Sequence, residues 1–348
     1  MPTRNSTFFT DVDWQAGGKQ IGTAWLPYSG HDDAWGAVAI PLAVIQGENP
    51  GSTVFISGAI HGDEYEGPIV INELIRNVQP AQVHGRLILM PSANAPAMRA
   101  HSRVSPLDGR NLARVFPGNP LGTPTEQIAA YIHDVVFPQC DAYIDLHAGG
   151  SSLFIEESAQ VVITPTLKAE TRERAEAMAR WFGARYTVIT DNMGDPRTSC
   201  GAAAALGLAA IAAEMGESGS ISPVGVKRTR ECVARVLDGL GVLPAAAPMP
   251  AAPRSRRVRM THGGNLLCPG DGWFEPLHQL GDSVAAGEVA GRLHRLSEPG
   301  EEPRQLVFPV GGLVYSQRTF GMARQGNSLC VLVDDVADDA QADMGETS

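Results

Sequence analysis

The chain has 348 residues, of which 43% are hydrophobic and 19% are charged, a composition typical of a soluble globular protein with a substantial core. The formal net charge of -11 argues against nucleic acid and anionic membranes as partners. The five cysteines are widely spaced and include no CxxC pair, which argues against a disulfide framework and favours a reducing compartment. Because no apolar leader or long apolar run is present, we expect a cytoplasmic protein.

Up to residue 243, short apolar runs alternate with segments of helical spacing. Strands are expected at residues 53–57, 86–90, 142–146, 186–190 and 208–213. Helices are expected at residues 65–78, 125–136, 165–182 and 222–240. The sequence TPTEQ predicts a capped start for the second helix, and Gly183 is expected to end the third. This alternation predicts an α/β fold with a mixed, mostly parallel sheet and helices on both faces.

The composition changes at residues 244–255, where alternating alanine and proline predict an extended linker. Beyond it, short apolar runs are separated by Gly, Pro and Asp turns, which is typical of a small all-β, barrel-like domain at residues 256–336. We therefore expect an α/β domain at residues 1–243, the linker, the β domain, and a frayed acidic tail at residues 337–348.

The motif GAIHGDEYEG, at residues 58–67, joins an expected strand to an expected helix. It carries His61 and Glu64, and an imidazole and a carboxylate at this spacing can bind one ion from a single loop bent at Gly58 and Gly62. Taken alone, the pair is more typical of a polar turn with an acid that caps the helix.

A second motif, DLHAGG, places His147 directly after the strand expected at residues 142–146. Ligands bind at the carboxyl ends of strands in open α/β sheets, so His147 and the His61/Glu64 pair are expected at the same edge. Two histidines and one carboxylate, with coordination positions left for water and substrate, favour one catalytic zinc ion per chain. Asp145 is expected to support the site from behind.

A third motif, IAAEMGESGS, places Glu214 after another apolar run at this edge. A carboxylate close to a metal can act as general base toward water and then as general acid toward a departing amine. Glu217 is the alternative, but it lies deeper in the Gly/Ser loop, so we prefer Glu214. For either residue, a solvated loop acid is the simpler interpretation.

The segment HSRVSPLDGRNLARVFPG, at residues 101–118, is basic and carries Arg103, Arg110 and Arg114. Arginine offers a planar fork for a carboxylate and a fixed positive charge for a developing oxyanion. Taken alone, each arginine is equally consistent with a solvated surface residue and with a substrate-binding residue. The segment is therefore a candidate substrate-binding loop.

In these motifs and their order, most of the chain resembles the succinylglutamate desuccinylase/aspartoacylase family, within the zinc carboxypeptidase superfamily. The resemblance implies a zinc carboxypeptidase-like fold and zinc ligands at His61, Glu64 and His147. It also implies that the C-terminal β domain is biotinyl/lipoyl-like and closes over the mouth of the active site.

The same resemblance implies that Glu214 activates water, that Arg103 polarises the scissile carbonyl, and that Arg114 pairs with a substrate carboxylate. The family usually has asparagine where this chain has Ala113. The loss of that amide removes a hydrogen bond near the substrate carboxylate, which can signal a changed substrate. Asn111, two residues earlier, is the candidate to compensate in part.

Within the family, three segments look like the N-alpha-acetyl-L-2,4-diaminobutyrate deacetylases of ectoine degradation. They are LPYSGHDDAWGAVAIP (residues 26–41), HGDEYEGP (residues 61–68) and RNLARVFPG (residues 110–118). This likeness implies hydrolysis of an acetyl amide on a small amino acid. Asn111, Arg114 and Tyr315 are then the candidate substrate-binding residues, and a small N-acylated amino acid is the expected partner.

Several alternatives to this function stay open. A family member that cleaves a different small amide, or a zinc carboxypeptidase acting on chain ends, would use the same metal ligands. A carrier protein would need a lysine to modify, and none occurs from residue 254 onward. A metal-binding protein without catalysis would leave Glu214 unexplained. The sequence leaves a homo-oligomer open.

Overall fold

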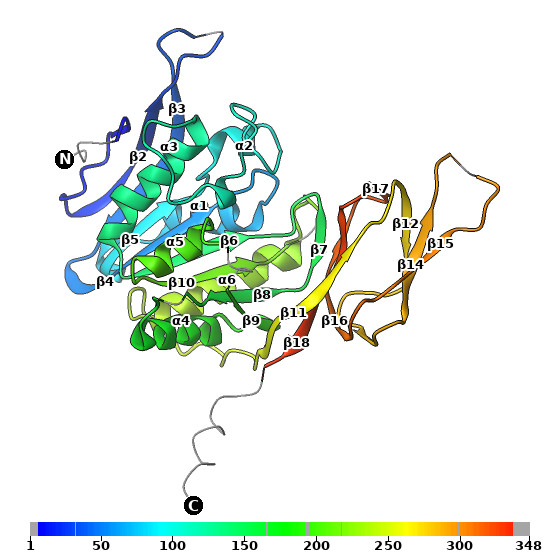
Figure 1. Ribbon diagram of the computed structural model, residues 1–348. Coiled ribbons are helices and arrows are strands. Elements are labelled where there is room, and N and C mark those ends of the chain that lie inside the picture. Colours follow the sequence, from blue (N-terminus) through cyan, green and yellow to red (C-terminus); the bar gives the residue numbers. More distant parts are fainter. Residues whose placement is uncertain are drawn as a thin grey trace, which may run out of the picture.

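The computed structural model describes residues 6–31, 33–164, 166–191, 195–216, 218–297 and 299–336. Within these ranges, 14 strands form one long sheet (Figure 1). They are β1 Phe9–Thr10, β2 Gly18–Pro27, β3 Ala37–Gln46, β4 Asn49–Gly58, β5 His84–Met90, β6 Ala142–His147, β7 Leu153–Ile155, β8 Ser158–Val162, β9 Tyr186–Thr190, β10 Ala209–Glu214, β11 Arg256–Leu267, β13 Ser283–Val284, β16 Gly312–Arg318 and β18 Ser328–Asp335.

The strand order is β1-β2-β3-β5-β4-β6-β10-β8-β9-β11-β18-β16-β13, and β7 pairs with β16 off this path. The central strands β5, β4, β6 and β10 are parallel, whereas β8 is antiparallel to β10 and β2 and β3 form an antiparallel hairpin. The sheet is therefore mixed, as expected. Its central strands are continuous apolar runs because both of their faces are covered.

Helices cover both faces of this sheet, which confirms the expected layering (Figure 1). Val54 and Ile56 of β4 point into one core, which is shared with helices α1 Glu66–Asn77, α4 Ala169–Phe182 and α6 Pro223–Gly239. Phe55 points into the opposite core, which is shared with α3 Pro124–Tyr131 and α5 Ser199–Ala205. A short helix, α2 Ala95–Arg99, follows β5.

The helix ends follow their capping residues. Glu126 accepts a hydrogen bond from the Thr123 N–H at 2.8 Å at the start of α3, and Gly183 takes a left-handed φ of 65° at the end of α4. The helix expected to reach residue 136 leaves α-helical geometry after Tyr131 and continues as a π turn, Ile132–Val136. The expected start of the next helix at Pro165 lies outside the described residues, and α4 begins at Ala169.

The C-terminal part is all β, and it is continuous with the main sheet. Residues 244–255 form no helix or strand, and β11 then pairs in parallel with β9, from Arg256 opposite Tyr186 to Arg259 opposite Ile189. A second, four-stranded sheet completes this part: β12 Gly272–Pro276, β14 Val289–His294, β15 Arg304–Val307 and β17 Met322–Ala323. Its own core includes Leu293, Phe308 and Leu329. The proposed domain boundaries remain a prediction.

The parallel strands bring three loops to one edge of the sheet. Gly58 lies opposite Leu146, near the ends of β4 and β6, and Glu214 lies opposite His147 at the ends of β10 and β6. This is the edge where open α/β sheets bind ligands. Among the described residues, no helix is both long and apolar enough to span a membrane.

Candidate active site

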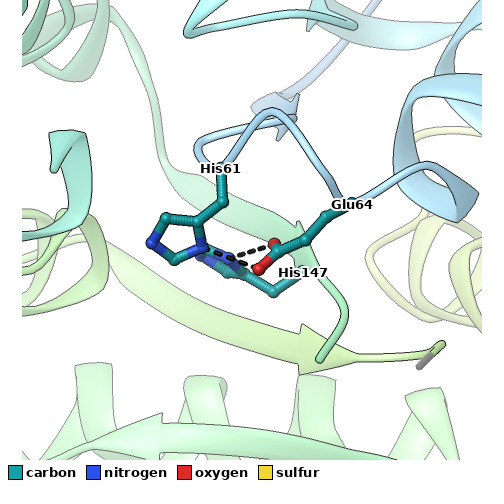
Figure 2. Close-up of side chains that lie close together, drawn as sticks. All are labelled: His61, Glu64 and His147. Carbon is teal, nitrogen blue, oxygen red and sulfur yellow. Dashed lines mark hydrogen bonds and ion pairs between the residues drawn. The ribbon is translucent and has the colours of Figure 1, made fainter. Parts of the chain in front are cut away.

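His61, Glu64 and His147 meet at this edge (Figure 2). His61 and Glu64 lie in the turn between β4 and α1. The turn needs Gly62, because a Cβ there would lie 2.0 Å from the carbonyl carbon of Ala97. One ligand atom from each side chain lies within 4.8 Å of the other two, and all three residues are buried. The expected cluster therefore forms, and its binding of zinc remains a prediction.

The hydrogen bonds of the two imidazole rings indicate how they are protonated. His61 Nε2 lies 3.1 Å from Asn111 Oδ1, and that oxygen already accepts the Ala113 N–H at 2.9 Å. His147 Nε2 lies 3.0 Å from Asp145 Oδ2. Each Nε2 thus faces an acceptor, so that a neutral ring at either position would carry its proton on Nε2 and its lone pair on Nδ1.

Both lone pairs point at the same carboxylate. His61 Nδ1 lies 2.7 Å from Glu64 Oε1, and His147 Nδ1 lies 2.9 Å from Glu64 Oε2. Acceptors this close need either an additional proton or a cation between them. Two imidazoles and a carboxylate are the donor set that catalytic zinc prefers, so the residues fit a zinc ion.

The electrostatics of the cluster reflect its burial. Burial lowers the pKa of His61 below its ordinary value. Burial opposes the charge on Glu64 and His147 as well, but attraction within the cluster outweighs it. His61 and His147 hold the pKa of Glu64 well below its usual range, and Asp145 and Glu64 raise the pKa of His147 well above its own.

Asp145 supports His147 from behind, as expected. It is fully buried, and besides His147 Nε2 it accepts hydrogen bonds from the Ser57 hydroxyl at 2.8 Å and from the Ser199 hydroxyl. A carboxylate behind a metal-binding imidazole fixes the ring and its tautomer. The two serines were not anticipated: Ser199 lies in a segment without a motif, and only the folded sheet brings Ser57 beside Asp145.

Glu214 ends β10 directly opposite His147. Its Oε2 atom is buried and has no hydrogen-bond partner in the part of the chain that the structure describes. Burial raises the pKa of Glu214 to about 8, although the charges of His147 and Arg103 act in the other direction. A carboxyl group with a perturbed pKa beside a metal site is a candidate acid/base. The alternative, Glu217, lies outside the described residues.

Tyr315 of β16 lies on the far side of Glu214. Ser158 of β8 is the register partner of Glu214, and its hydroxyl lies 2.7 Å from the Tyr315 hydroxyl. Gln160 donates to the same Tyr315 hydroxyl at 3.4 Å, and Tyr315 is only 1% exposed. The side chain is thus close enough to Glu214 for the two to interact electrostatically. Its role in substrate binding remains a prediction.

Two of the three predicted arginines gather near the cluster. The Arg103 guanidinium is partly exposed, with Nη1 3.4 Å from His61 Nδ1 and 3.7 Å from Glu64 Oε1. Arg114 is about half exposed and lies 3.7 Å from Asp195 Oδ2. Burial and the charge of Arg103 lower the pKa of Arg114. Arg110 instead pairs with Glu126 of α3.

Two further buried acids belong to the motif of residues 58–67 but were not singled out from the sequence. Asp63 lies between the two candidate ligands and accepts two hydrogen bonds from Ser151. Glu66 accepts the Ser222 N–H at 3.1 Å, which joins the start of α1 to the start of α6, and burial raises its pKa. Their position inside the ligand motif was the only available signal.

This sheet, with two histidines and a carboxylate at its strand ends, defines an α/β protein with a candidate metal centre. Residues 50–240 match the succinylglutamate desuccinylase/aspartoacylase catalytic domain. The chain is 32% identical over 332 residues to the N-alpha-acetyl-L-2,4-diaminobutyric acid deacetylase of Halomonas elongata, an alignment that covers 95% of this chain and 96% of that protein. The chain therefore belongs to the succinylglutamate desuccinylase/aspartoacylase family.

Two solved structures show the same fold over nearly the whole chain. The product-bound ectoine utilization protein EutE (DoeB) from Ruegeria pomeroyi gives a TM-score of 0.89 at 32% identity, covering 95% of this chain and all of that one. A succinylglutamate desuccinylase from Silicibacter sp. TM1040 also gives 0.89, at 31% identity, covering 96% of this chain and all of that one.

Proposed function

We propose that this protein is a zinc-dependent amidohydrolase that removes an acetyl group from the amine of a small amino acid, such as N-acetyl-2,4-diaminobutyrate. The main observation behind the proposal is that His61, Glu64 and His147 meet beside the strand that carries Glu214, whose Oε2 atom has no hydrogen-bond partner in the described part of the chain. Membership of a deacylase family and the similarity to a named deacetylase support the same reaction class.

In this proposal, His61, His147 and the Glu64 carboxylate would hold one zinc ion. When bound, zinc would act as a Lewis acid, which lowers the pKa of a water molecule and polarises an amide carbonyl. Asn111 and Asp145 keep both rings oriented through their Nε2 atoms.

Glu214 is the proposed proton carrier. It accepts a proton from the attacking water as the new C–O bond forms, and it returns that proton to the amine nitrogen as the C–N bond breaks. The products are acetate and the free amine. Between the two steps the proton stays on the Glu214 carboxyl.

The arginines are proposed to bind and polarise the substrate. Arg103 places a positive charge beside the metal ligands, where it stabilises the oxyanion of the tetrahedral intermediate. Arg114 offers its guanidinium to the substrate carboxylate. Asn111 is proposed to complete the binding site, and the buried Tyr315 is proposed to support it through the Ser158 hydroxyl.

A second candidate function is the same deacylation of a different small amide, and Ala113 is the observation that favours it. The Ala113 side chain carries no polar group, and its backbone N–H is taken by Asn111 Oδ1. That amide oxygen also faces His61, so only the Nδ2 group of Asn111 is left to donate toward a substrate carboxylate in place of the asparagine that the family usually has at position 113.

A substrate panel tests the proposal. N-acetyl-2,4-diaminobutyrates acetylated at either amine, N-acetylaspartate, N-succinylglutamate and a dipeptide would be compared with and without a metal chelator. We expect acetate release from an N-acetyl amino acid, loss of activity with the chelator, and recovery on addition of zinc. Activity that a chelator leaves intact, or cleavage of the dipeptide alone, would contradict it.

A further inference from the structure

The loop that follows His147 is held from two opposite sides through one residue, Ser151. We propose that Asp63 and Thr319 are positioning residues that act through Ser151 to fix this loop, and that they thereby couple the C-terminal β strands to the metal ligands. The proposal rests on the proposed function, because it assigns a role toward the same site.

Asp63 holds the loop from the metal side. It lies between His61 and Glu64 in the chain and is 2% exposed. Its Oδ2 atom accepts hydrogen bonds from the Ser151 backbone N–H at 2.8 Å and from the Ser151 hydroxyl at 2.7 Å. Hydrogen bonds to a buried carboxylate are strong, so the ligand turn and the loop are expected to move together.

Gly150 shows how close this contact is. It has a φ of +56°, and a Cβ at this position would lie 2.8 Å from Asp63 Oδ2. Backbone conformation and space therefore both require glycine, which lets the loop backbone reach the carboxylate.

Thr319 holds the loop from the C-terminal side. Its hydroxyl donates to the Ser151 carbonyl, and its backbone N–H donates to the Ser152 carbonyl at 3.1 Å. Thr319 directly follows β16, which continues the connection by pairing with β7, where Arg318 lies opposite Leu153. The C-terminal β strands are thus hydrogen-bonded to the segment that directly follows His147, a candidate metal ligand.

The same loop is also bonded to the strand end that carries Glu214. Gly149 donates its N–H to the Gly216 carbonyl at 2.8 Å, and Met215 donates its N–H to the His147 carbonyl at 3.0 Å. A displacement of residues 148–152 would therefore shift His147 and Glu214 together. Productive sites tolerate displacements of only about 0.5 Å, so fixing this loop matters for metal binding and for catalysis.

A variant pair isolates the Thr319 hydroxyl. Thr319→Val removes the bond to Ser151 at nearly constant shape, and Thr319→Ser keeps it. Thr261→Val is the matched control, because the Thr261 hydroxyl is buried without a hydrogen-bond partner in the described chain. Asp63→Asn weakens the contact from the other side, and the Asp63→Asn/Thr319→Val double variant shows whether the two act on one loop.

Two measurements separate positioning from general stability. The first is zinc affinity by competition with a chromophoric chelator, and the second is hydrogen–deuterium exchange of residues 147–153 in the metal-free protein. We expect Thr319→Val and Asp63→Asn to bind zinc on the order of 10-fold more weakly and to exchange faster in this peptide. Thr319→Ser and Thr261→Val should match the wild type, and the double variant should lose less than the product of the single effects.

Zinc affinity within twofold of the wild type in both variants, with unchanged exchange at residues 147–153, would overturn the proposal even if the thermal midpoint fell. If the wild type itself binds no zinc, the proposed function fails. The exchange measurement on the metal-free protein then still decides whether Asp63 and Thr319 fix the loop.

Discussion

Glu214 lies directly opposite His147 where β10 and β6 end, so a carboxyl group whose Oε2 atom has no hydrogen-bond partner among the described residues shares one face of the sheet with a candidate metal ligand. Residues paired across neighbouring strands have side chains about 5 Å apart. The sheet register therefore places the Glu214 carboxyl beside a candidate metal ligand, and the loops supply the other candidate ligands and the arginines.

Replacing Glu214 with glutamine should lower kcat by about 100- to 10,000-fold, because the amide cannot carry the proton between water and the leaving amine. Zinc content should stay at the wild-type level, since Glu214 is not among the proposed ligands. Steady-state kinetics and metal analysis on the same sample check both points. Glu73→Gln, at an exposed pair with Arg230, is the control, and a variant at Glu214 with full activity would rule out the assigned role.

Replacing Arg114 with lysine should raise KM about 10-fold or more while kcat changes little, because lysine loses the planar fork that matches a carboxylate. The matched control is Arg110→Lys in the same loop, where the arginine pairs with Glu126. Kinetics on a substrate and on its carboxamide analogue provide the check. Equal effects at the two positions would mean that Arg114 does not bind the substrate carboxylate.

Replacing Tyr315 with phenylalanine distinguishes two roles for this buried hydroxyl. If Tyr315 contacts substrate, KM rises. If it acts through Ser158, whose hydroxyl lies 2.7 Å away, kcat falls at constant KM. The burial of Tyr315 leads us to expect the second pattern, with a loss of severalfold. Unchanged values of both parameters would remove Tyr315 from the site.

The local features of this fold could be predicted from the sequence because their causes are local. Apolar runs indicated β4, β6 and β9, helical spacing indicated α6, and the three candidate ligands were expected at one edge because parallel strands end together. The β2–β3 hairpin was not identified from the sequence. Pro41 interrupts the apolar run of β3, and in β2 the apolar Ile21 is 68% exposed, so the strand does not alternate between buried apolar and exposed polar residues.

The remaining features depend on contacts between distant residues. The Ala- and Pro-rich residues 244–255 predict a linker between two separate domains. In the structure, β11 follows this segment and pairs in parallel with β9, so the main sheet continues beyond it. Asp63 and Ser151 are 88 positions apart, and no pattern links them. Helix α5 is alanine-rich and buried on most of its surface, so it lacks the polar face that marks an amphipathic helix.

Glu176 of α4 should make stability depend on pH. Burial opposes its charge, but Arg172 and Arg257 donate hydrogen bonds to it at 2.9 and 3.1 Å and lower its pKa below the ordinary 4.5. Its ionised form therefore stabilises the fold above pH 4.5, and this contribution is lost as the pH falls through the folded-state pKa. Glu176→Gln should cost about 1 kcal/mol in urea unfolding at pH 7 and progressively less at lower pH. A cost independent of pH would contradict this.

Zinc content of the purified protein after chelation and reconstitution tests the three candidate ligands most directly, when the wild type is compared with His61→Ala, Glu64→Ala and His147→Ala. We expect one zinc ion per wild-type chain and a loss of tightly bound zinc in each variant. A wild type that takes up no zinc, or variants that retain it as tightly as the wild type, would contradict the assignment of these three residues.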